Sequence, residues 1–150
     1  MIMNTLSWLK QNNLKINSQD LNRPWGAFWQ IDQSSLDIFL SLFFPNHKEK
    51  ENINPKILLV NANKKLSLQL HNRRNEKWHI IKGPVKVVLD KNEYILNENE
   101  EIEIPINTPH RLCGLENYGL VAEIWIHTNP QHPSDENDIV RLEDDFNRLN

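Results

Sequence analysis

Apolar and polar positions alternate along the middle of the chain, from residue 56 to residue 127. The apolar runs are short and are separated by polar residues or by glycine and proline, with hardly any helical spacing between them. This pattern is typical of β-strands divided by turns. Many short strands in succession predict an all-β fold, either a sandwich or a closed antiparallel barrel. We expect the strands at residues 27–31, 56–60, 66–71, 76–81, 85–89, 93–96, 101–105, 110–113 and 120–127.

Two segments before these strands have helical spacing. Residues 3–12 predict a short helix with Leu6 and Leu9 near one face. Residues 34–45 predict a second helix, with Ser35 as its N-cap. This second helix either packs on the barrel or forms a contact between two copies of the chain. We favour the contact, and hence a homodimer, because an exposed apolar stripe needs a cover. The stripe consists of Leu36, Phe39, Leu40, Phe43 and Phe44.

The two ends of the chain differ from its middle. Residues 12–19 are polar and predict a linker, so we divide the chain into an N-terminal helix and linker, residues 1–22, and a single domain, residues 23–150. Near the C-terminus, residues 134–148 predict a helix with Ser134 near its N-cap. Its apolar positions are Ile139, Leu142, Phe146 and Leu149.

Composition and charge narrow the class of protein. A chain of 150 residues with 39% hydrophobic and 25% charged residues fits one soluble domain. The net charge of −3 and the pI near 6.1 argue against a nucleic-acid or anionic-membrane partner. The single cysteine, Cys113, cannot form an internal disulfide, and residues 1–11 lack the apolar core of a signal peptide. We therefore expect a cytoplasmic protein.

The stretch from residue 66 to residue 83 carries the candidate chemistry. Gln69 and His71 lie two positions apart, so on a strand both side chains point to the same face. Glu76 follows a short polar turn, and His110 ends a later alternating run. Converging inside a small barrel, these four side chains would offer two nitrogens and two oxygens to one divalent metal. The set suits zinc, manganese, iron, cobalt and nickel and does not by itself choose among them, although we expect zinc first. The alternative is a β-hairpin whose polar turn happens to carry a glutamate.

Several motifs occur in a fixed order along most of the chain. They are Arg23-Pro-Trp-Gly26, Leu66-Ser-Leu-Gln-Leu-His71, Arg74-x-Glu76-x-Trp78, Gly83, Ile104-Pro105, Pro109-His-Arg-Leu112 and Asp138-Ile-Val-Arg-x-Glu-Asp144. Together they resemble the cupin domain of type II phosphomannose isomerases, which longer relatives join to a mannose-1-phosphate guanylyltransferase. The resemblance implies a cupin double-stranded β-helix, a jelly-roll barrel with short flanking helices. It also favours an extended C-terminal tail over the helix.

The resemblance implies an isomerase that interconverts mannose 6-phosphate and fructose 6-phosphate through an enediol. Such a reaction needs a Lewis acid, which the metal would supply, together with a base and cationic groups for the phosphate. We expect Gln69, His71, Glu76 and His110 as metal ligands. We expect catalytic roles for Arg111, Glu123 and Lys82. We expect the substrate to be bound by Arg73, Arg74, Arg23 and Trp78, with Lys56 as a further cation.

The base has three candidates in the sequence, His79, Glu123 and Lys77. On its predicted strand His79 has the opposite parity to Glu76, so it should face away from the metal. The chain also departs from the family at Asn72, Arg73, Lys77 and Asn107, where relatives carry histidines or a glycine. Asn107 can still adopt the left-handed conformation that the glycine provides.

Other functions remain open. A cupin could bind a sugar or sugar phosphate without turnover, or act on a different sugar. A metal-free epimerase would need a tyrosine, but Tyr94 and Tyr118 lie away from the motifs. An iron-dependent dioxygenase ranks below the binding protein. The motifs include no guanylyltransferase part, so we expect no nucleotide-sugar synthesis from this chain.

Overall fold

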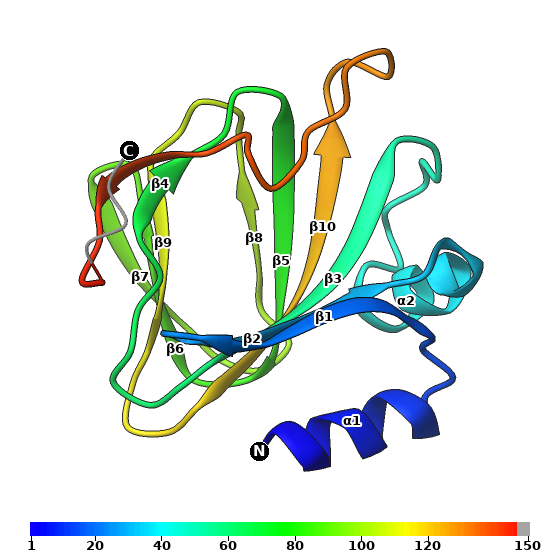
Figure 1. The fold of residues 1–150 in the computed structure, drawn as a ribbon, viewed down its shortest axis with the longest axis horizontal. Helices are drawn as coiled ribbons and strands as arrows, with labels where there is room; N and C mark the ends of the chain where they lie inside the picture. Colours follow the sequence, from blue (N-terminus) through cyan, green and yellow to red (C-terminus); the bar gives the residue numbers. More distant parts are fainter. Residues whose placement is uncertain (147–150) are drawn as a thin grey trace.

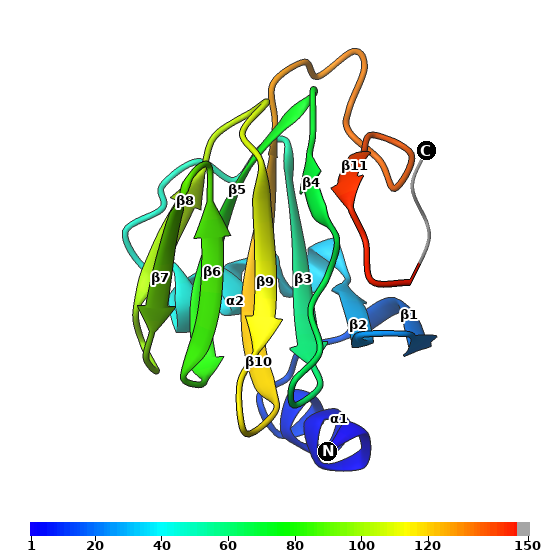
Figure 2. The ribbon, with the colours of Figure 1, turned by 90° about the vertical axis from the view of Figure 1, so that its left-hand side faces the viewer.

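The computed structural model describes residues 1–146, and most of its backbone lies in two antiparallel β-sheets (Figures 1 and 2). The strands are β1 (Ile16–Arg23), β2 (Gly26–Ile31), β3 (Ile53–Val60), β4 (Leu68–Leu70), β5 (Arg74–Lys82), β6 (Val85–Leu89), β7 (Asn92–Leu96), β8 (Glu101–Ile104), β9 (His110–Gly114), β10 (Gly119–His127) and β11 (Val140–Glu143). One sheet has the order β1-β2-β3-β10-β5-β8 and the other β11-β4-β9-β6-β7. The all-β, two-sheet barrel predicted from the strand pattern is therefore confirmed.

Alternation along the central strands produces two separate cores. On β3, Leu58 and Val60 point into the space between the sheets, where Trp78 also lies. Ile57 and Leu59, on the same strand, point to the outer face of the six-stranded sheet. Successive side chains of a strand face opposite sides, so a single strand serves both cores. The core between the sheets contacts the candidate site, and the core on the outer face packs the helices against the six-stranded sheet.

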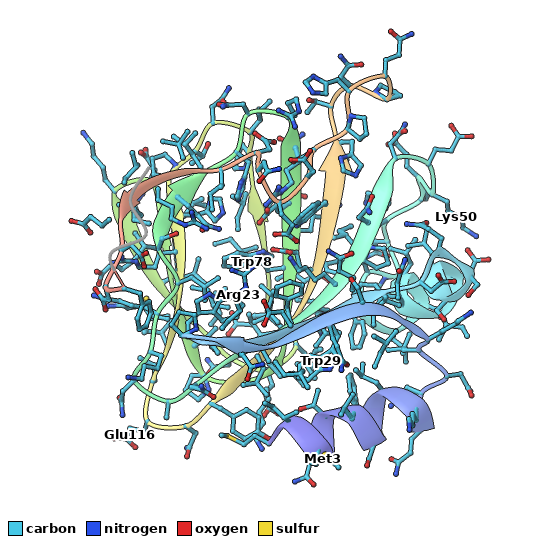
Figure 3. All side chains as sticks on the ribbon, in the orientation of Figure 1. Met3, Arg23, Trp29, Lys50, Trp78 and Glu116 are labelled. Carbon is cyan, nitrogen blue, oxygen red and sulfur yellow. The ribbon has the colours of Figure 1, made fainter. Side chains whose placement is uncertain are left out.

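The helices cover the outer face of the six-stranded sheet (Figure 1). They are α1 (Ile2–Gln11), the short 3₁₀ helix η1 (Gln33–Ser35) and α2 (Leu36–Phe43). Leu9 of α1 and Phe39 of α2 are fully buried there, and Figure 3 shows Trp29 on the same side of the sheet, towards α1. Within residues 1–146, no helix is long and apolar enough to cross a membrane.

The apolar stripe of residues 36–44 is covered by its own chain. All five of its side chains are buried against the sheet and α1. The expectation that this stripe forms a contact between two copies is therefore wrong, and a homodimer stays a prediction that needs another surface. Ser35 occupies the N-cap position of α2, but its hydroxyl accepts a hydrogen bond from the main-chain N–H of Lys15 rather than capping the helix.

Both predicted end segments need correction. Residues 12–19 do not form a linker, because β1 begins at Ile16 and pairs with β2. The predicted helix over residues 134–148 is also wrong in its described part, where β11 pairs with β4. The main chain of the tail forms its hydrogen bonds with the edge of β4 and not within a helix. Leu149 lies outside the described residues.

Asparagine takes the place of glycine in many of the turns. The chain has only four glycines, and among residues 1–146 five asparagines adopt positive φ angles. Asn107 has a φ of 59°, which confirms the prediction that it adopts the left-handed conformation. The turn at Asn107 leads directly towards His110. The five residues are Asn13, Asn52, Asn63, Asn99 and Asn107.

Candidate metal centre

Three buried side chains from three strands or their ends meet between the two sheets. His71 directly follows β4, Glu76 lies on β5, and His110 begins β9. His71 Nε2 is 3.3 Å from one carboxylate oxygen of Glu76, and His110 Nε2 is 3.6 Å from the other. One donor atom from each residue lies within 4.8 Å of the other two. The geometry therefore groups three of the four side chains that we expect as metal ligands.

Hydrogen bonds orient both imidazoles towards the same point. Nδ1 of His71 is 2.7 Å from the main-chain oxygen of Asp138, and Nδ1 of His110 is 2.9 Å from that of Thr108. A carbonyl oxygen only accepts, so each Nδ1 carries the hydrogen and each Nε2 presents a lone pair. Proteins usually orient a metal-binding histidine by a hydrogen bond from its other ring nitrogen to a carbonyl or carboxylate oxygen.

Burial and charge set the protonation of the cluster. Burial is the main cause that lowers the pKa of His71 to about 4, and burial also lowers the pKa of His110. Burial acts to raise the pKa of Glu76, but the Arg74 guanidinium and the two histidines outweigh it and hold this pKa below its usual range. Neutral imidazoles beside an ionised carboxylate are the protonation states that a metal requires.

The residues present fit a divalent metal. Two imidazole nitrogens and a carboxylate form a donor set that zinc, manganese, iron, cobalt and nickel accept. His110 Nε2 is buried, and among residues 1–146 it has no hydrogen-bond partner. Gln69 pairs with His110 across β4 and β9, and its amide lies 3.4 Å from His71 Nε2. The amide oxygen of Gln69 accepts from Ser67 at 2.7 Å, so rotation of the amide would be needed before this oxygen could act as the fourth ligand.

A second buried carboxylate lies beside the cluster. Glu123 accepts hydrogen bonds from the indole nitrogens of Trp78 at 2.8 Å and Trp125 at 2.7 Å. The Trp78 indole also lies 3.2 Å from Glu76, so it links the two carboxylates. Burial, followed by the charge of Glu76, raises the pKa of Glu123 to about 8. Two carboxyl groups in one site thus have very different affinities for a proton.

A cavity opens next to the cluster and carries several cations. Arg23 lines it, and Figure 3 shows Arg23 near Trp78 in the space between the sheets. Lys56 is buried, forms an ion pair with Glu136 at 2.9 Å and lies 4.0 Å from the centre of the Phe28 ring. The polar residues lining the cavity are Arg23, Lys56, Ser67, Gln69, His71, Arg74, Glu123, Glu136 and Arg141.

Residues 128–139, which we call the C-terminal strap, hold the cluster from outside. Figure 1 shows the strap leaving β10 and crossing from the six-stranded sheet to the five-stranded sheet. The carboxylate of Asp138 accepts hydrogen bonds from the main-chain N–H groups of Asn72 and Arg73 and from the hydroxyl of Ser134. The strap therefore fixes the turn that follows His71.

Three of the residues that we expect in catalysis or substrate binding lie outside the cavity. Arg111 donates to the main-chain oxygens of Leu66 and Glu143, so it fastens the tail to the barrel. Arg73 points to the strap, with a guanidinium nitrogen 3.6 Å from Asp135. Lys82 lies over the ring of Tyr118 on the outer side of the six-stranded sheet. The other catalytic and substrate-binding candidates, and one expected ligand, do line the cavity. They are Arg23, Arg74, Trp78, Glu123 and Gln69.

The alternative bases also face outwards. His79 contacts the rings of Phe43 and Phe44, as its parity predicted. Lys77 pairs with Glu103 and lies 3.2 Å from His47. Of the three candidate bases, only Glu123 lines the cavity.

Sequence reasoning missed two contributors. Trp125 has the same parity on β10 as Glu123, so strand alternation was a sufficient signal for its inward direction. Asp138 begins a recognised motif, but its contact with His71 joins positions 67 residues apart. No local pattern indicates such a contact.

The fold and the buried histidine–glutamate–histidine cluster together define a cupin protein. Among solved structures, KdgF from Halomonas sp. has a TM-score of 0.60 at 14% identity and covers 83% of this chain and 96% of its own. CapF from Staphylococcus aureus, a capsular polysaccharide assembling protein, has a TM-score of 0.59 at 15% identity over 84% of this chain and 34% of its own. At these identities the likeness concerns the fold, and it confirms the expected cupin barrel.

The sequence comparisons are more specific. A family described as "Mannose-6-phosphate isomerase C-terminal" matches residues 44–144, and the chain belongs to this family. Mannose-1-phosphate guanylyltransferase ManC of Salmonella typhimurium is 30% identical over 131 residues, which are 87% of this chain and 23% of the relative. Alginate biosynthesis protein AlgA of Pseudomonas syringae pv. tomato is 30% identical over 134 residues, 89% of this chain and 24% of the relative. The chain thus spans about a quarter of the length of these relatives, and the resemblance found in its motifs is confirmed.

Proposed function

We propose that this chain is a metal-dependent sugar-phosphate isomerase that interconverts mannose 6-phosphate and fructose 6-phosphate. The observation that carries the proposal is the position of Glu123, which lines the same cavity as His71 and is linked through the Trp78 indole to Glu76 of the cluster. Membership of the mannose-6-phosphate isomerase C-terminal family supports the choice of substrate. The guanylyltransferase activity in the names of the relatives is not proposed for this chain.

His71, Glu76 and His110 would hold the metal, with Gln69 as the fourth ligand. When bound, the metal supplies Lewis acidity that stabilises negative charge on the sugar oxygens. The three buried residues are already in the charge state that favours such a cation. His71 connects the cluster with the cavity, so the reacting end of the sugar would lie beside His71.

Glu123 is our candidate for the proton shuttle. Isomerisation removes the proton from C2 of the aldose and delivers it to C1 of the ketose, so one group can perform both transfers. The indoles of Trp78 and Trp125 hold each oxygen of Glu123 in place, which favours a single orientation of the carboxyl group. Since His79 and Lys77 face outwards, Glu123 is the base that best fits the cavity.

The phosphate would be bound by the cations on the rest of the cavity lining. Arg23, Lys56 and Arg141 all line it. Arginine suits a phosphate because its planar guanidinium donates two parallel hydrogen bonds and stays charged. Lys56 is paired with Glu136 in the structure, so the phosphate would share this lysine with the carboxylate.

A turnover assay tests the proposed function. The full chain is stripped with a chelator, supplied with mannose 6-phosphate and given each divalent metal in turn. We expect fructose 6-phosphate with at least one metal and none with His71→Ala, whereas the exposed His132→Ala should behave as wild type. Tight zinc binding without conversion by any metal would overturn the isomerase and favour a cupin that only binds a sugar phosphate.

A further inference from the structure

The guanidinium of Arg74 lies against two of the proposed metal ligands. Its Nε donates to Glu76 Oε2 at 2.7 Å, and one of its terminal nitrogens donates to His71 Nε2 at 3.1 Å. Arg74 is buried, as are Glu76 and His71. A charged side chain of the protein thus occupies the metal-facing side of the cluster.

Other contacts anchor Arg74 in this position. Its second terminal nitrogen donates to the hydroxyl of Ser134 at 2.8 Å and to the main-chain oxygen of Asp135 at 3.1 Å. Its central carbon lies 3.6 Å from the centre of the Trp125 ring, a cation–π contact. All three partners lie on β10 or the strap, and none of them is a proposed ligand. These contacts allow the guanidinium to stay in the site while it gives up its bond to His71.

The contact between Arg74 and His71 excludes coordination by the same atom. Nδ1 of His71 carries the hydrogen that is donated to Asp138, so Nε2 holds the only lone pair of this ring that can bind a partner. That lone pair accepts from Arg74 in the structure, and a metal bound by His71 would need it. A divalent cation would also share the Glu76 carboxylate with the guanidinium, at a separation where like charges repel strongly in a buried site.

We propose that Arg74 is an internal cation that competes with the divalent metal for His71 and Glu76. Without metal, Arg74 neutralises the buried carboxylate of Glu76, whose charge would otherwise lack a partner of opposite sign. Metal binding withdraws the guanidinium from His71, so part of the metal's binding free energy is spent on this exchange. Arg74 thereby sets the metal affinity of the centre. This inference rests on the metal centre of the proposed function and concerns its regulation.

Zinc titration calorimetry on the chelator-stripped full chain tests the competition. Wild type is compared with Arg74→Met, which keeps an unbranched apolar side chain but removes the guanidinium. The control is Lys82→Met, which removes one positive charge from the other end of the same strand, outside the barrel. We expect Arg74→Met to bind zinc roughly 5- to 150-fold more tightly than wild type, the usual range for coupling between two sites. Lys82→Met should bind zinc as wild type does.

Thermal unfolding of the same proteins provides a second readout that does not depend on activity. In chelator, Arg74→Met should unfold at a lower temperature than wild type, because Glu76 has lost its cation. Saturating zinc should raise its Tm by more than it raises that of wild type. If Arg74→Met does not fold, zinc is titrated into wild type and followed by the NMR signal of the Arg74 guanidinium, assigned by its loss in Arg74→Lys. This signal should shift in proportion to zinc bound.

The outcomes separate the competition from the proposed function. Equal or weaker zinc binding by Arg74→Met, or an Arg74 signal that zinc leaves unchanged, overturns the competition while the metal centre stands. No zinc binding by either protein overturns the centre and the competition together. Tighter zinc binding by Arg74→Met, together with a wild type that fails to convert mannose 6-phosphate with any metal, supports the competition and rejects the isomerase alone.

Discussion

The main-chain oxygen of Asp138 lies 2.7 Å from Nδ1 of His71, although the two residues are 67 positions apart. The main chain and the side chain of Asp138 both form hydrogen bonds with residues 71–73. Its carboxylate accepts from the N–H groups of Asn72 and Arg73, each at 2.9 Å. One residue of the strap therefore fixes the tautomer of a proposed ligand and the turn that follows this ligand.

Removal of the Asp138 side chain should weaken the metal centre. In Asp138→Ala the strap loses its bonds to Asn72 and Arg73 and its internal bond to Ser134, so the carbonyl of residue 138 no longer holds His71 in a fixed orientation. We expect zinc affinity to fall about 10- to 100-fold, the range found when outer partners of metal ligands are removed. Calorimetry measures the affinity, and Asp135→Asn, an exposed neighbour on the strap, is the control. Equal affinities for Asp138→Ala and wild type would contradict the positioning role.

Glu123→Gln should lose turnover and keep the metal. Glutamine has nearly the shape of glutamate but cannot accept a proton from the sugar carbon. We expect kcat to fall by about 10²- to 10⁴-fold, the usual contribution of a general base. Zinc affinity should change much less, since Glu123 is not among the proposed ligands. The control is Glu103→Gln, at an exposed carboxylate paired with Lys77 outside the barrel. A Glu123→Gln enzyme with normal kcat would exclude Glu123 as the base.

Phe39→Ala tests whether α2 is part of the core. The Phe39 ring is fully buried and contacts the rings of Phe43 and Phe44 at centroid distances of 5.0 and 6.2 Å. We expect the free energy of unfolding to fall by about 3–5 kcal/mol, as for other buried phenylalanines. Leu42→Ala, at a 43% exposed position on the same helix, should cost less than about 1 kcal/mol. Urea unfolding measures both, and equal costs would argue against the packing described here.

The ion pair of Lys56 and Glu136 should make stability depend on pH. Burial acts to raise the pKa of Glu136, but Lys56, with Arg74 and Arg23, outweighs it and holds the pKa below its ordinary value of 4.5. A pKa that is lower in the folded protein stabilises the fold above the unfolded pKa, and this stabilisation is lost as pH falls through the folded pKa.

Glu136→Gln removes this pH-dependent contribution. Glu136 is partly exposed, so we expect the variant to be only about 0.5 kcal/mol less stable than wild type at pH 7. The difference should shrink as the pH is lowered below about 4.5 towards 3, because Glu136 in wild type then becomes protonated. Urea unfolding of both proteins across this range measures it. A difference that does not change with pH would show that the lost charge is not its source.

Strand alternation predicted most of the barrel and the inward direction of the proposed ligands. Gln69 and His71 share a face as their spacing indicated, and His79 faces away from the cavity. The same rule argued against Arg111, because it follows the inward-facing His110 on the same strand. Lys82 shares the parity of Glu76, but an irregularity between Ile80 and Lys82 in the pairing with β10 breaks the alternation. A sequence pattern does not reveal such a bulge.

The tail shows why helical spacing alone was insufficient. Residues 139–146 have apolar positions that suit a helix, yet β11 lies along β4, some seventy positions earlier in the chain. The main chain of the tail satisfies its hydrogen bonds with that distant edge, and Arg111 fastens the tail further through the main-chain oxygen of Glu143. A local sequence pattern does not predict a pairing between segments so far apart, because the folded barrel brings them together. The contact of Asp138 with His71 escaped prediction for the same reason.

Opening of the strap can be followed by hydrogen exchange at two main-chain amides. The amide hydrogens of Asn72 and Arg73 are held by the carboxylate of Asp138, so they become available to solvent when the strap lifts. Their rates of exchange with deuterium therefore measure how often it does so. Ile139 and Arg141 line the cavity and Ser134 holds Arg74, so a strap that lifts also uncovers the cavity lining. Two main-chain amides thus measure how often the cavity is uncovered.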